Sequence, residues 1–347
     1  MSNPGVSTPS PQPSPRRGEG AKPRRFLRVA LILATLALLT AAFAYWSLWA
    51  SAGPALDKPQ TVIVEQGSSL SRVTSQLVSV GAVPGTDATY RVMARLFGSA
   101  DPIQAGEFEI PAGTSGAGLL DILQHGQPVQ RLVTVPEGTP SIIVHEKLMA
   151  EKLLTGSVSV PAEGSVLPDS YGFQRGESRA AVLKRMQDAM TRELDRLWAK
   201  RQPHSVVTSK QDAVTLASVV EKETGKPSER PMVAGVYSNR LRIGMKLDAD
   251  PTVIYPITKG KPLGRRIRRS ELQADNGYNT YARAGLPAGP IANPGRESIA
   301  AVLNPARTQA LFFVADGTGG HIFANTLAEH NANVAKWYAL RRARGEM

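Results

Sequence analysis

The rest of the chain is organised around residues Leu216–Tyr255, which read LASVVEKETGKPSERPMVAGVYSNRLRIGMKLDADPTVIY. This stretch opens with an apolar run that ends on Glu221, and an ionised carboxylate is costly to bury in such a run. Ser209 and Asp212 form a capping-box-like pattern, which predicts a helix from Lys210 to about Thr224. So many polar residues inside an apolar frame indicate an active site rather than a core.

Glu221 lies seven residues after Val214 and four after Ala217, so all three share one face of this helix. Burial on an apolar face and the negative end of the helix dipole both oppose ionisation of its carboxyl group. A carboxyl group that stays protonated can serve as a general acid near neutral pH. An ion pair at the helix end, with Lys222 or Arg230, is an alternative of equal weight.

Three further features of the same stretch bear on the site. Glu223 faces away from Glu221 on a regular helix and is the rival acid. A second helix is expected over 231–241, because the segment begins with proline. Residues 250–252 read as a turn and residues 253–255 as a strand. Asp250 is therefore either a second carboxylate of the site or the acceptor of an Asx turn.

The composition is ordinary for a chain of two or three globular domains, with 347 residues, of which 42% are hydrophobic and 20% charged. There are no cysteines, which excludes a disulfide framework and a thiolate metal site. The net charge of +12 is concentrated in clusters at 1–28, 259–269 and 341–344. Such clusters suit anionic partners, although a solvated surface is the simpler interpretation.

Residues 29–50 form an uncharged apolar run, long enough as a helix to span the roughly 30 Å hydrocarbon core of a bilayer. Tyr45, Trp46 and Trp49 lie at its far end, where an aromatic belt is expected. Basic residues flank only its N-terminal side, so the positive-inside rule places the N-terminus in the cytoplasm. We expect an uncleaved anchor rather than a signal peptide. A nucleic acid partner is not expected outside the membrane.

After the anchor, one 16-residue pattern occurs three times without gaps: VIVEQGSSLSRVTSQL (62–77), FEIPAGTSGAGLLDIL (108–123) and VTVPEGTPSIIVHEKL (133–148). Each copy has a strand pattern, a glycine that can take a positive φ, and a Ser or Thr directly after it as the helix cap. We expect strand–turn–helix modules that share one sheet. The first module resembles LysM, a fold that binds N-acetylated glycans; a spacer without a ligand is the alternative.

The remaining elements flank the opening stretch. A loop over 163–173 and an amphipathic helix over 177–201 precede it. After it come a rigid Gly- and Pro-rich loop over 278–295, a β-hairpin made of 311–315 and 321–323, and a terminal helix.

The loop over 278–295 carries the polar and aromatic residues that suit a sugar. It begins with Tyr278, Asn279, Thr280 and Tyr281. Aromatic faces pack on the CH face of a sugar ring, while amide and hydroxyl groups bind its rim of hydroxyls.

No metal and no cofactor are expected. The histidines form no H-x-x-x-H or H-E-x-x-H pattern; they are His125, His145, His204, His321 and His330. There is also no convincing G-x-S-x-G elbow, no G-x-G-x-x-G and no P-loop.

Several motifs together resemble the YceG-like endolytic murein transglycosylases, the MltG family. In order they are ASVVEKET (217–224), NRL (239–241), GMKLDADPTVIY (244–255), YNTY (278–281), GLPAGPIANPG (285–295), FVADGTGGHIF (313–323) and EHN (329–331). The likeness covers nearly the whole chain after residue 26. One departure is visible, because many relatives have Gln-Thr-Asp-Pro where this chain has Asp248-Ala249-Asp250-Pro251.

The resemblance implies cleavage of the β-1,4 bond between N-acetylmuramic acid and N-acetylglucosamine inside peptidoglycan strands, leaving a 1,6-anhydro end without water. It implies that the first acid of the V-E-K-E-T run, Glu221, is the general acid/base. Ordinary glycosidases need two carboxylates, whereas here the sugar's 6-hydroxyl is the nucleophile and one glutamate is sufficient. The residues expected to orient the glycan are Asn239, Asp250, Thr252, Tyr278, Asn279, Thr280 and Tyr281. Supporting roles fall to Glu223, His321, His330 and Asn331.

The expected fold class is α+β. It comprises a disordered cytoplasmic tail (1–25), a transmembrane helix (26–50), a linker (51–60), a LysM-like subdomain with βα repeats (61–160) and a mixed α/β YceG-like catalytic domain (161–347). The enzyme is expected in the inner membrane as a single-pass protein with its catalytic domain in the periplasm. Expected partners are nascent peptidoglycan strands, the lipid bilayer and peptidoglycan synthases.

Two other functions stay open at this point. One is a non-catalytic peptidoglycan-binding scaffold, with the LysM-like module as the working part. The other is a hydrolytic muramidase that uses Glu221 with Asp250. The basic cluster 259–269 suits the carboxylates of peptidoglycan stem peptides or anionic lipid head groups.

Overall fold

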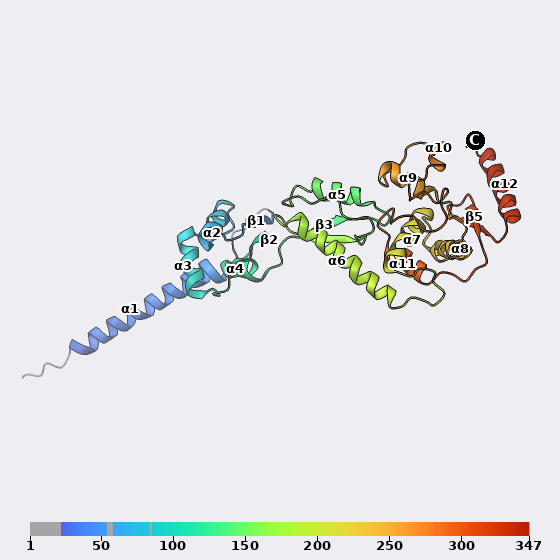
Figure 1. Ribbon diagram of the computed structural model, residues 1–347. Coiled ribbons are helices and arrows are strands. Elements are labelled where there is room, and N and C mark those ends of the chain that lie inside the picture. Colours follow the sequence, from blue (N-terminus) through green and yellow to red (C-terminus); the bar gives the residue numbers. More distant parts are fainter. Residues whose placement is uncertain (1–21, 54–57, 84, 347) are drawn as a thin grey trace, which may run out of the picture. The chain divides into compact units, whose positions relative to one another are not determined.

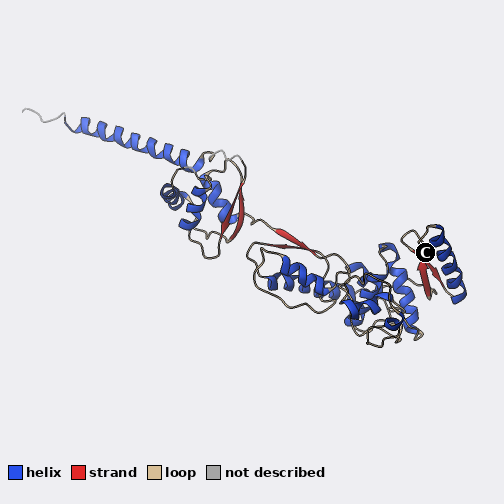
Figure 2. Ribbon diagram, turned by 90° about the horizontal axis from the view of Figure 1, so that it is seen from above, coloured by secondary structure: helices blue, strands red, loops and turns tan. Residues whose placement is uncertain are grey.

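The structure is a computed structural model that describes residues 22–53, 58–83 and 85–346. The chain divides into two compact units between Pro128 and Val129. Figure 1 labels most of the helices and strands of both, and Figure 2 colours the same ribbon by secondary structure. Helices and short strands occur in each unit, so the mixed α/β class is confirmed. The tail expected over 1–25 lies outside the described residues as far as residue 21, and a helix begins at Lys22.

The first unit is built on a two-stranded antiparallel sheet. Its elements are α1 (Lys22–Tyr45), the π-helical turn η1 (Trp46–Ala50), β1 (Gln60–Val64), α2 (Leu70–Ser79), α3 (Asp87–Phe97), β2 (Gly106–Ile110) and α4 (Gly116–His125). β1 pairs with β2 so that Val62 lies opposite Phe108, and both side chains are buried. Tyr90 of α3 and Leu119 of α4 complete the same core.

The N-terminal helix is long and apolar enough to cross a membrane over residues 25–50, and most of its large apolar side chains are exposed. One detail of the sequence-based expectation is wrong. Trp49 is only 3% exposed and packs against Tyr90, with ring centroids 5.7 Å apart. The helix end is therefore part of the first unit's core, and Trp49 cannot belong to an aromatic belt in contact with lipid.

The strand–glycine–helix pattern is confirmed in all three copies. The turn glycines all have positive φ: Gly67 (77°), Gly113 (75°) and Gly138 (71°). The helix caps lie one residue later than expected. Ser69 and Ser115 cap the first two helices, and Pro140 precedes the third without a side-chain cap. A second residue after the glycine is needed to bring the chain back to the helix start.

The expectation that all three modules share one sheet is wrong. β1 and β2 pair with each other, whereas β3 (Arg131–Thr134) pairs with β4 (Ser170–Phe173) in the second unit. The loop expected over 163–173 therefore ends in a strand. The division between the units falls inside the subdomain expected over 61–160. Strand pairing depends on partners distant in sequence, which a local repeat does not specify.

The second unit is mainly helical around a buried central helix. After β3 its elements are α5 (Ser141–Ala150), β4, α6 (Arg179–Trp198), α7 (Lys210–Glu223), the 3₁₀ turn η2 (Pro227–Glu229), α8 (Arg230–Arg242), α9 (Asp250–Thr258), α10 (Arg269–Leu272), α11 (Arg296–Leu303), β5 (Phe312–Ala315), β6 (His321–Ala324) and α12 (Leu327–Ala343). The helices expected over 177–201, 210–224 and 231–241 are confirmed. So is the hairpin, because β5 pairs antiparallel with β6.

Helix α7 positions the site because it is buried along most of its length. Ser209 and Asp212 form the expected capping box at its start. All residues from Ala213 to Val220 are buried, with α8, α9 and α11 packed around them. In Figure 1 these four elements lie close together in the yellow-to-orange part of the chain. A helix held on all sides presents the side chains of its last turn in fixed directions.

The turn and strand expected over 250–255 are wrong, because Asp250 begins helix α9. Pro251 is its second residue, where an N–H has no intrahelical partner and proline is tolerated. The β-branched residues Val253 and Ile254 favour a strand in isolation. Here Val253 is 1% exposed, so burial against the core overrides that local preference.

Candidate active site

A pocket of about 460 Å³ opens where α7 ends, and we call it the Glu223 pocket. It is lined by Glu223, Tyr237, Arg240, Leu247, Asp248, Asp250, Tyr281, Phe312, Phe313, Leu327 and His330. These residues come from α7, α8, α9, the loop over 278–295, β5, α12 and the segment before α9. The pocket thus combines three carboxyl groups with aromatic walls.

The carboxyl group of Glu223 has the properties of a general acid. Burial, together with the negative charge of Asp250, raises the pKa of Glu223 to about 7. The neighbouring hydroxyl of Tyr237 and the guanidinium of Arg240 act in the opposite direction and do not cancel this rise. Its Oε1 is buried and has no hydrogen-bond partner among the described residues. A carboxyl group of this kind is protonated in part at neutral pH and has one oxygen without a hydrogen-bond partner.

Asp250 lies at the start of α9 and is oriented by Tyr281. The Tyr281 hydroxyl donates a hydrogen bond of 2.7 Å to Asp250 Oδ1. Burial and this hydrogen bond both raise the pKa of Tyr281, so its hydroxyl stays a donor. Asp248 lies near the same wall, where Arg240 Nη1 approaches its Oδ2 to 3.4 Å. The Asp248-Ala249-Asp250 segment therefore places two carboxylates at the pocket.

The opposite wall is aromatic and includes a histidine. His330 of α12 stacks on Phe312 of β5, with ring centroids 5.2 Å apart and planes at 23°. Burial and the charge of Arg240 lower the pKa of His330, so its ring is neutral at physiological pH. Its Nδ1 is buried without a partner within the described part of the chain. A flat apolar wall with one polar edge suits the face of a sugar ring.

Glu221 has a different environment, on another side of α7. Its Oε1 accepts a hydrogen bond of 3.0 Å from Arg230 Nη2, and its Oε2 accepts one of 2.9 Å from the Gly295 backbone N–H. The side chain is 5% exposed. Arg230 also binds Glu137 at 2.7 Å and Glu297 at 2.8 Å. The ion pair weighed as the alternative for Glu221 is therefore present, and both of its oxygens are engaged.

Three of the residues expected to orient the glycan are buried and hold the pocket together instead. The Thr252 and Thr280 hydroxyl oxygens lie 2.9 Å apart, and Thr280 Oγ1 accepts the Ala249 N–H at 3.0 Å. Asn279 Nδ2 donates to three backbone carbonyls of the segment 271–274. These bonds fix the start of α9 against the loop that carries Tyr281, so they position Asp250 and its partner.

Three other expected residues lie outside the Glu223 pocket. Asn239 donates to the carbonyls of Thr308 and Ala310, which fixes the segment leading into β5. Tyr278 packs against Tyr255, with ring centroids 5.0 Å apart. Asn331 is exposed on α12. The structure does not bring these side chains to Glu223.

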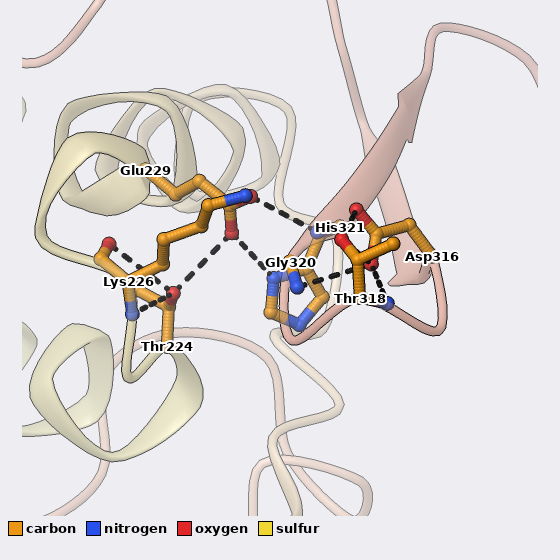
Figure 3. A network of polar contacts seen from close by, with 7 residues as sticks. All are labelled: Thr224, Lys226, Glu229, Asp316, Thr318, Gly320 and His321. Carbon is orange, nitrogen blue, oxygen red and sulfur yellow. Dashed lines mark hydrogen bonds and ion pairs between the residues drawn. The ribbon is translucent and has the colours of Figure 1, made fainter.

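His321 belongs to a polar network that joins the hairpin to the end of α7 (Figure 3). Its Nδ1 lies 2.8 Å from Glu229 Oε2, and its backbone N–H donates to Glu229 Oε1 at 3.0 Å. The Thr224 hydroxyl donates to the same carboxylate at 3.3 Å. Thr224 directly follows Glu223, and Phe313 of the hairpin lines the pocket. The network therefore links the β5–β6 hairpin, which contributes Phe313 to the pocket, to the end of helix α7, which carries Glu223.

Of the residues singled out in the sequence, the structure gathers Glu223, Asp250, Tyr281 and His330 in one pocket. The sequence reasoning missed the pocket roles of Tyr237, Arg240, Phe312 and Phe313. A signal for the first two existed, because Tyr237 and Arg240 are three residues apart and share a face of α8. The phenylalanines were read only as part of a strand.

The fold and the pocket define a mixed α/β protein with a buried carboxyl group of raised pKa in an aromatic-walled cavity. Residues 62–336 match the model of the YceG-like family, and the chain belongs to that family. It is 34% identical over 182 residues to an endolytic murein transglycosylase of Bacillus subtilis (strain 168), covering 52% of this chain and 49% of that protein.

A second relative is the endolytic murein transglycosylase of Streptococcus pneumoniae serotype 2 (strain D39 / NCTC 7466). It is 28% identical over 325 residues, covering 80% of this chain and 58% of that protein. The chain thus spans about half the length of the curated relatives it matches. A crystal structure of a yceG-like protein from Listeria monocytogenes is 25% identical, with a TM-score of 0.49, covering 79% of this chain and 99% of that one.

Proposed function

We propose that this protein is a membrane-anchored endolytic lytic transglycosylase. It cleaves the β-1,4 bond between N-acetylmuramic acid and N-acetylglucosamine within nascent peptidoglycan strands and leaves a 1,6-anhydro end. Membership of the YceG-like family and the names of the two relatives support this reaction class. The observation that carries it is the buried carboxyl group of Glu223 in a cavity with aromatic walls.

We assign the general acid/base role to Glu223 rather than to Glu221. The assignment to Glu221 depended on its place on the apolar face of the helix and on the family resemblance, and the V-E-K-E-T run contains both acids. Both oxygens of Glu221 already accept hydrogen bonds, one of them from a guanidinium. Glu223 keeps an unpartnered oxygen and is protonated in part at neutral pH. Only the second arrangement leaves a proton and an oxygen free for substrate.

The reaction then proceeds with one carboxyl group. Glu223 donates its proton to the glycosidic oxygen as the bond from C1 of N-acetylmuramic acid to that oxygen breaks. The resulting carboxylate accepts the proton of the same sugar's 6-hydroxyl, whose oxygen forms the new bond to C1. No water is consumed, and Glu223 ends protonated as it began. Asp250, held by Tyr281, places negative charge near the positive charge that develops at C1.

The test compares Glu223→Gln with Glu221→Gln on purified glycan strands, with products identified by mass spectrometry. Glu223→Gln should lower the rate by about 10²–10⁴-fold, the usual contribution of a general acid. Glu221→Gln should keep most activity per folded molecule. The assignment is refuted if Glu223→Gln stays active while Glu221→Gln is inactive and folded. A wild type that binds strands without cutting them would instead indicate a peptidoglycan-binding scaffold.

One observation favours a second candidate, a hydrolytic muramidase. Asp250 lines the same pocket as Glu223, so two carboxyl groups are present, as ordinary glycosidases require. In that reaction Asp250 activates water or forms a covalent bond to the sugar. The same mass spectra decide, because each hydrolysed product is heavier by one water than its anhydro counterpart.

We propose that α1 anchors the protein in the inner membrane, with the N-terminus in the cytoplasm and the second unit in the periplasm. The length and apolar composition of residues 25–50, and the basic residues before them, support this topology. Protease digestion of intact spheroplasts tests it, since the second unit should be cut and the N-terminus protected. Protection of the second unit would overturn the topology.

The LysM-like role of the first unit is also a proposal. A pocket of about 420 Å³ lined by residues of α2, α3, α4 and the segment 98–103 supports binding of glycan there. Ala100→Trp should fill this pocket and weaken binding of the full chain to sacculi. Unchanged binding would favour a structural spacer.

A further inference from the structure

A second cavity in the same unit has no role in the chemistry above. It measures about 490 Å³, and we call it the Lys222 pocket. Two of the residues that line it are sequence neighbours of residues that line the Glu223 pocket. Lys222 precedes Glu223 in α7, and Pro251 follows Asp250 in α9. Since consecutive residues of a helix point about 100° apart, the same two helices present one wall to each cavity.

The Lys222 pocket is lined mainly by apolar and cationic side chains. The apolar ones include Ile143, Ile254, Leu263 and Ile291, the cationic ones are Lys222 and Lys261, and Thr139 and Tyr255 also line it. Lys222 is exposed, and its ammonium group makes no hydrogen bond or ion pair with any residue that the structure describes. That of Lys261 binds Glu146 at 2.6 Å, and both side chains are nearly half exposed. The carboxylate of Glu137, also at the pocket, is engaged by Arg230.

This combination does not suit further sugar residues. A glycan backbone is a chain of neutral polyols, which are bound by aromatic faces and by amide or hydroxyl groups. Four aromatic side chains and His330 line the Glu223 pocket. The Lys222 pocket has one aromatic residue, Tyr255, and is otherwise lined mainly by aliphatic side chains and the ammonium groups of Lys222 and Lys261. The Lys222 pocket suits a ligand with small apolar side chains and a carboxylate. Its volume is within the roughly 300–1,000 Å³ of small-ligand sites.

We propose that the Lys222 pocket binds the peptide stem of the N-acetylmuramic acid residue that is being cleaved. This inference rests on the proposed function. The stem is attached through a lactyl ether at C3 of the sugar whose C1 reacts at Glu223, and it carries methyl groups and free carboxylates. Three to five extended residues reach about 10–17 Å, and the two pockets are lined by consecutive residues of the same two helices. The methyl groups contact the isoleucine and leucine side chains, and Lys222 binds a carboxylate.

The consequence is a preference for strands that still carry their peptides. We expect the full-length wild type, in detergent, to cleave peptide-bearing strands faster than strands stripped of peptides by an amidase. Lys222→Ala and the pocket-filling Ile143→Trp should each lower the ratio of these two rates about 10-fold, as loss of a charged contact does. Because each ratio is taken within one variant, loss of folded protein cancels. Lys259 belongs to the basic cluster 259–269, as Lys261 does, but it does not line the pocket. Lys259→Ala should therefore keep the wild-type ratio.

Direct binding separates this inference from the proposed function. The full-length Glu223→Gln variant is titrated with a synthetic stem tripeptide, L-alanyl-D-glutamyl-L-lysine. Saturable binding that Lys222→Ala weakens at least about 10-fold supports the inference, even if the wild type cuts neither substrate and the proposed function fails. Absence of binding, or binding that neither Lys222→Ala nor Ile143→Trp changes, overturns it, even if the wild type cuts both kinds of strand.

Discussion

Replacing Glu223 by glutamine should stabilise the second unit at alkaline pH while lowering activity by about 10²–10⁴-fold. The pKa of this carboxyl group is about 7 in the folded chain against an ordinary value of 4.5. Each unit of difference corresponds to about 1.4 kcal/mol, so ionising the buried group lowers the free energy of unfolding by about 3 kcal/mol. Glutamine has nearly the same shape and is neutral at every pH.

The direction of the stability difference between Glu223→Gln and the wild type follows from the pH dependence of unfolding. Below about pH 4.5 both the folded and the unfolded chain carry the proton, and the group has no effect on the free energy of unfolding. Between about pH 4.5 and 7 the unfolded chain releases the proton and the folded chain keeps it, so wild-type stability falls as the pH rises. Above pH 7 the loss is complete, and the advantage of Glu223→Gln should reach its plateau of about 3 kcal/mol.

Glu221→Gln is the matched control, because it makes the same chemical change two residues away. It removes the charge from a carboxylate that accepts hydrogen bonds from Arg230 and the Gly295 N–H. Loss of such a charge-assisted contact should destabilise the unit by about 1–3 kcal/mol at pH 8. The two substitutions therefore shift stability in opposite directions.

Hydrogen exchange of the α7 backbone amides measures the change in the unfolding free energy of the second unit, since these amides exchange only on extensive opening. Exchange is measured at pH 5, 6, 7 and 8 for the wild type and both variants, with correction for the intrinsic pH dependence. The reasoning is refuted if Glu223→Gln loses protection at pH 8. It is also refuted if the difference between this variant and the wild type does not change between pH 5 and 8.

The remaining predictions concern the pH profile, Asp250 and the hairpin. Because Glu223 must carry a proton to act as the acid, kcat/KM on glycan strands should fall above about pH 7; a rate that rises through pH 8 would exclude this role. Asp250→Asn removes a negative charge that raises the pKa of Glu223, so the alkaline limb should move to lower pH, and an unmoved limb would contradict the electrostatic coupling. Glu229→Gln weakens the contact with His321, so the backbone amides of β5 and β6 should exchange about 10-fold faster. The amides of α5 should exchange at the wild-type rate. Equal acceleration in the hairpin and in α5 would indicate general destabilisation instead.

Local sequence signals predicted most elements of the second unit that carry the site. The capping box of Ser209 and Asp212, the proline near the start of α8 and the hairpin pattern each act within a few residues, and each is confirmed. The turn glycines of the repeats are confirmed for the same reason. Helix α9 was missed because its β-branched residues favour a strand until the core buries them.

The hydrogen-bond partners of the buried polar residues were predicted less well than their burial. Thr252, Asn279 and Thr280 stood out as polar residues in an apolar frame, and they are buried, but their hydrogen bonds go to the protein. A sequence shows that a polar group needs a partner. It does not show whether that partner is a backbone carbonyl or a substrate.

The sequence by itself determined that a buried acid ends α7 and that Glu221 and Glu223 point in different directions, because both follow from helical periodicity. Only the tertiary structure decided which neighbours surround each of the two carboxyl groups. Arg230 and the Gly295 N–H donate hydrogen bonds to Glu221. Glu223 instead lines a pocket that it shares with Tyr237 and Asp250. These neighbours come from segments distant in the chain, and the pKa of a carboxyl group depends on what surrounds it in space.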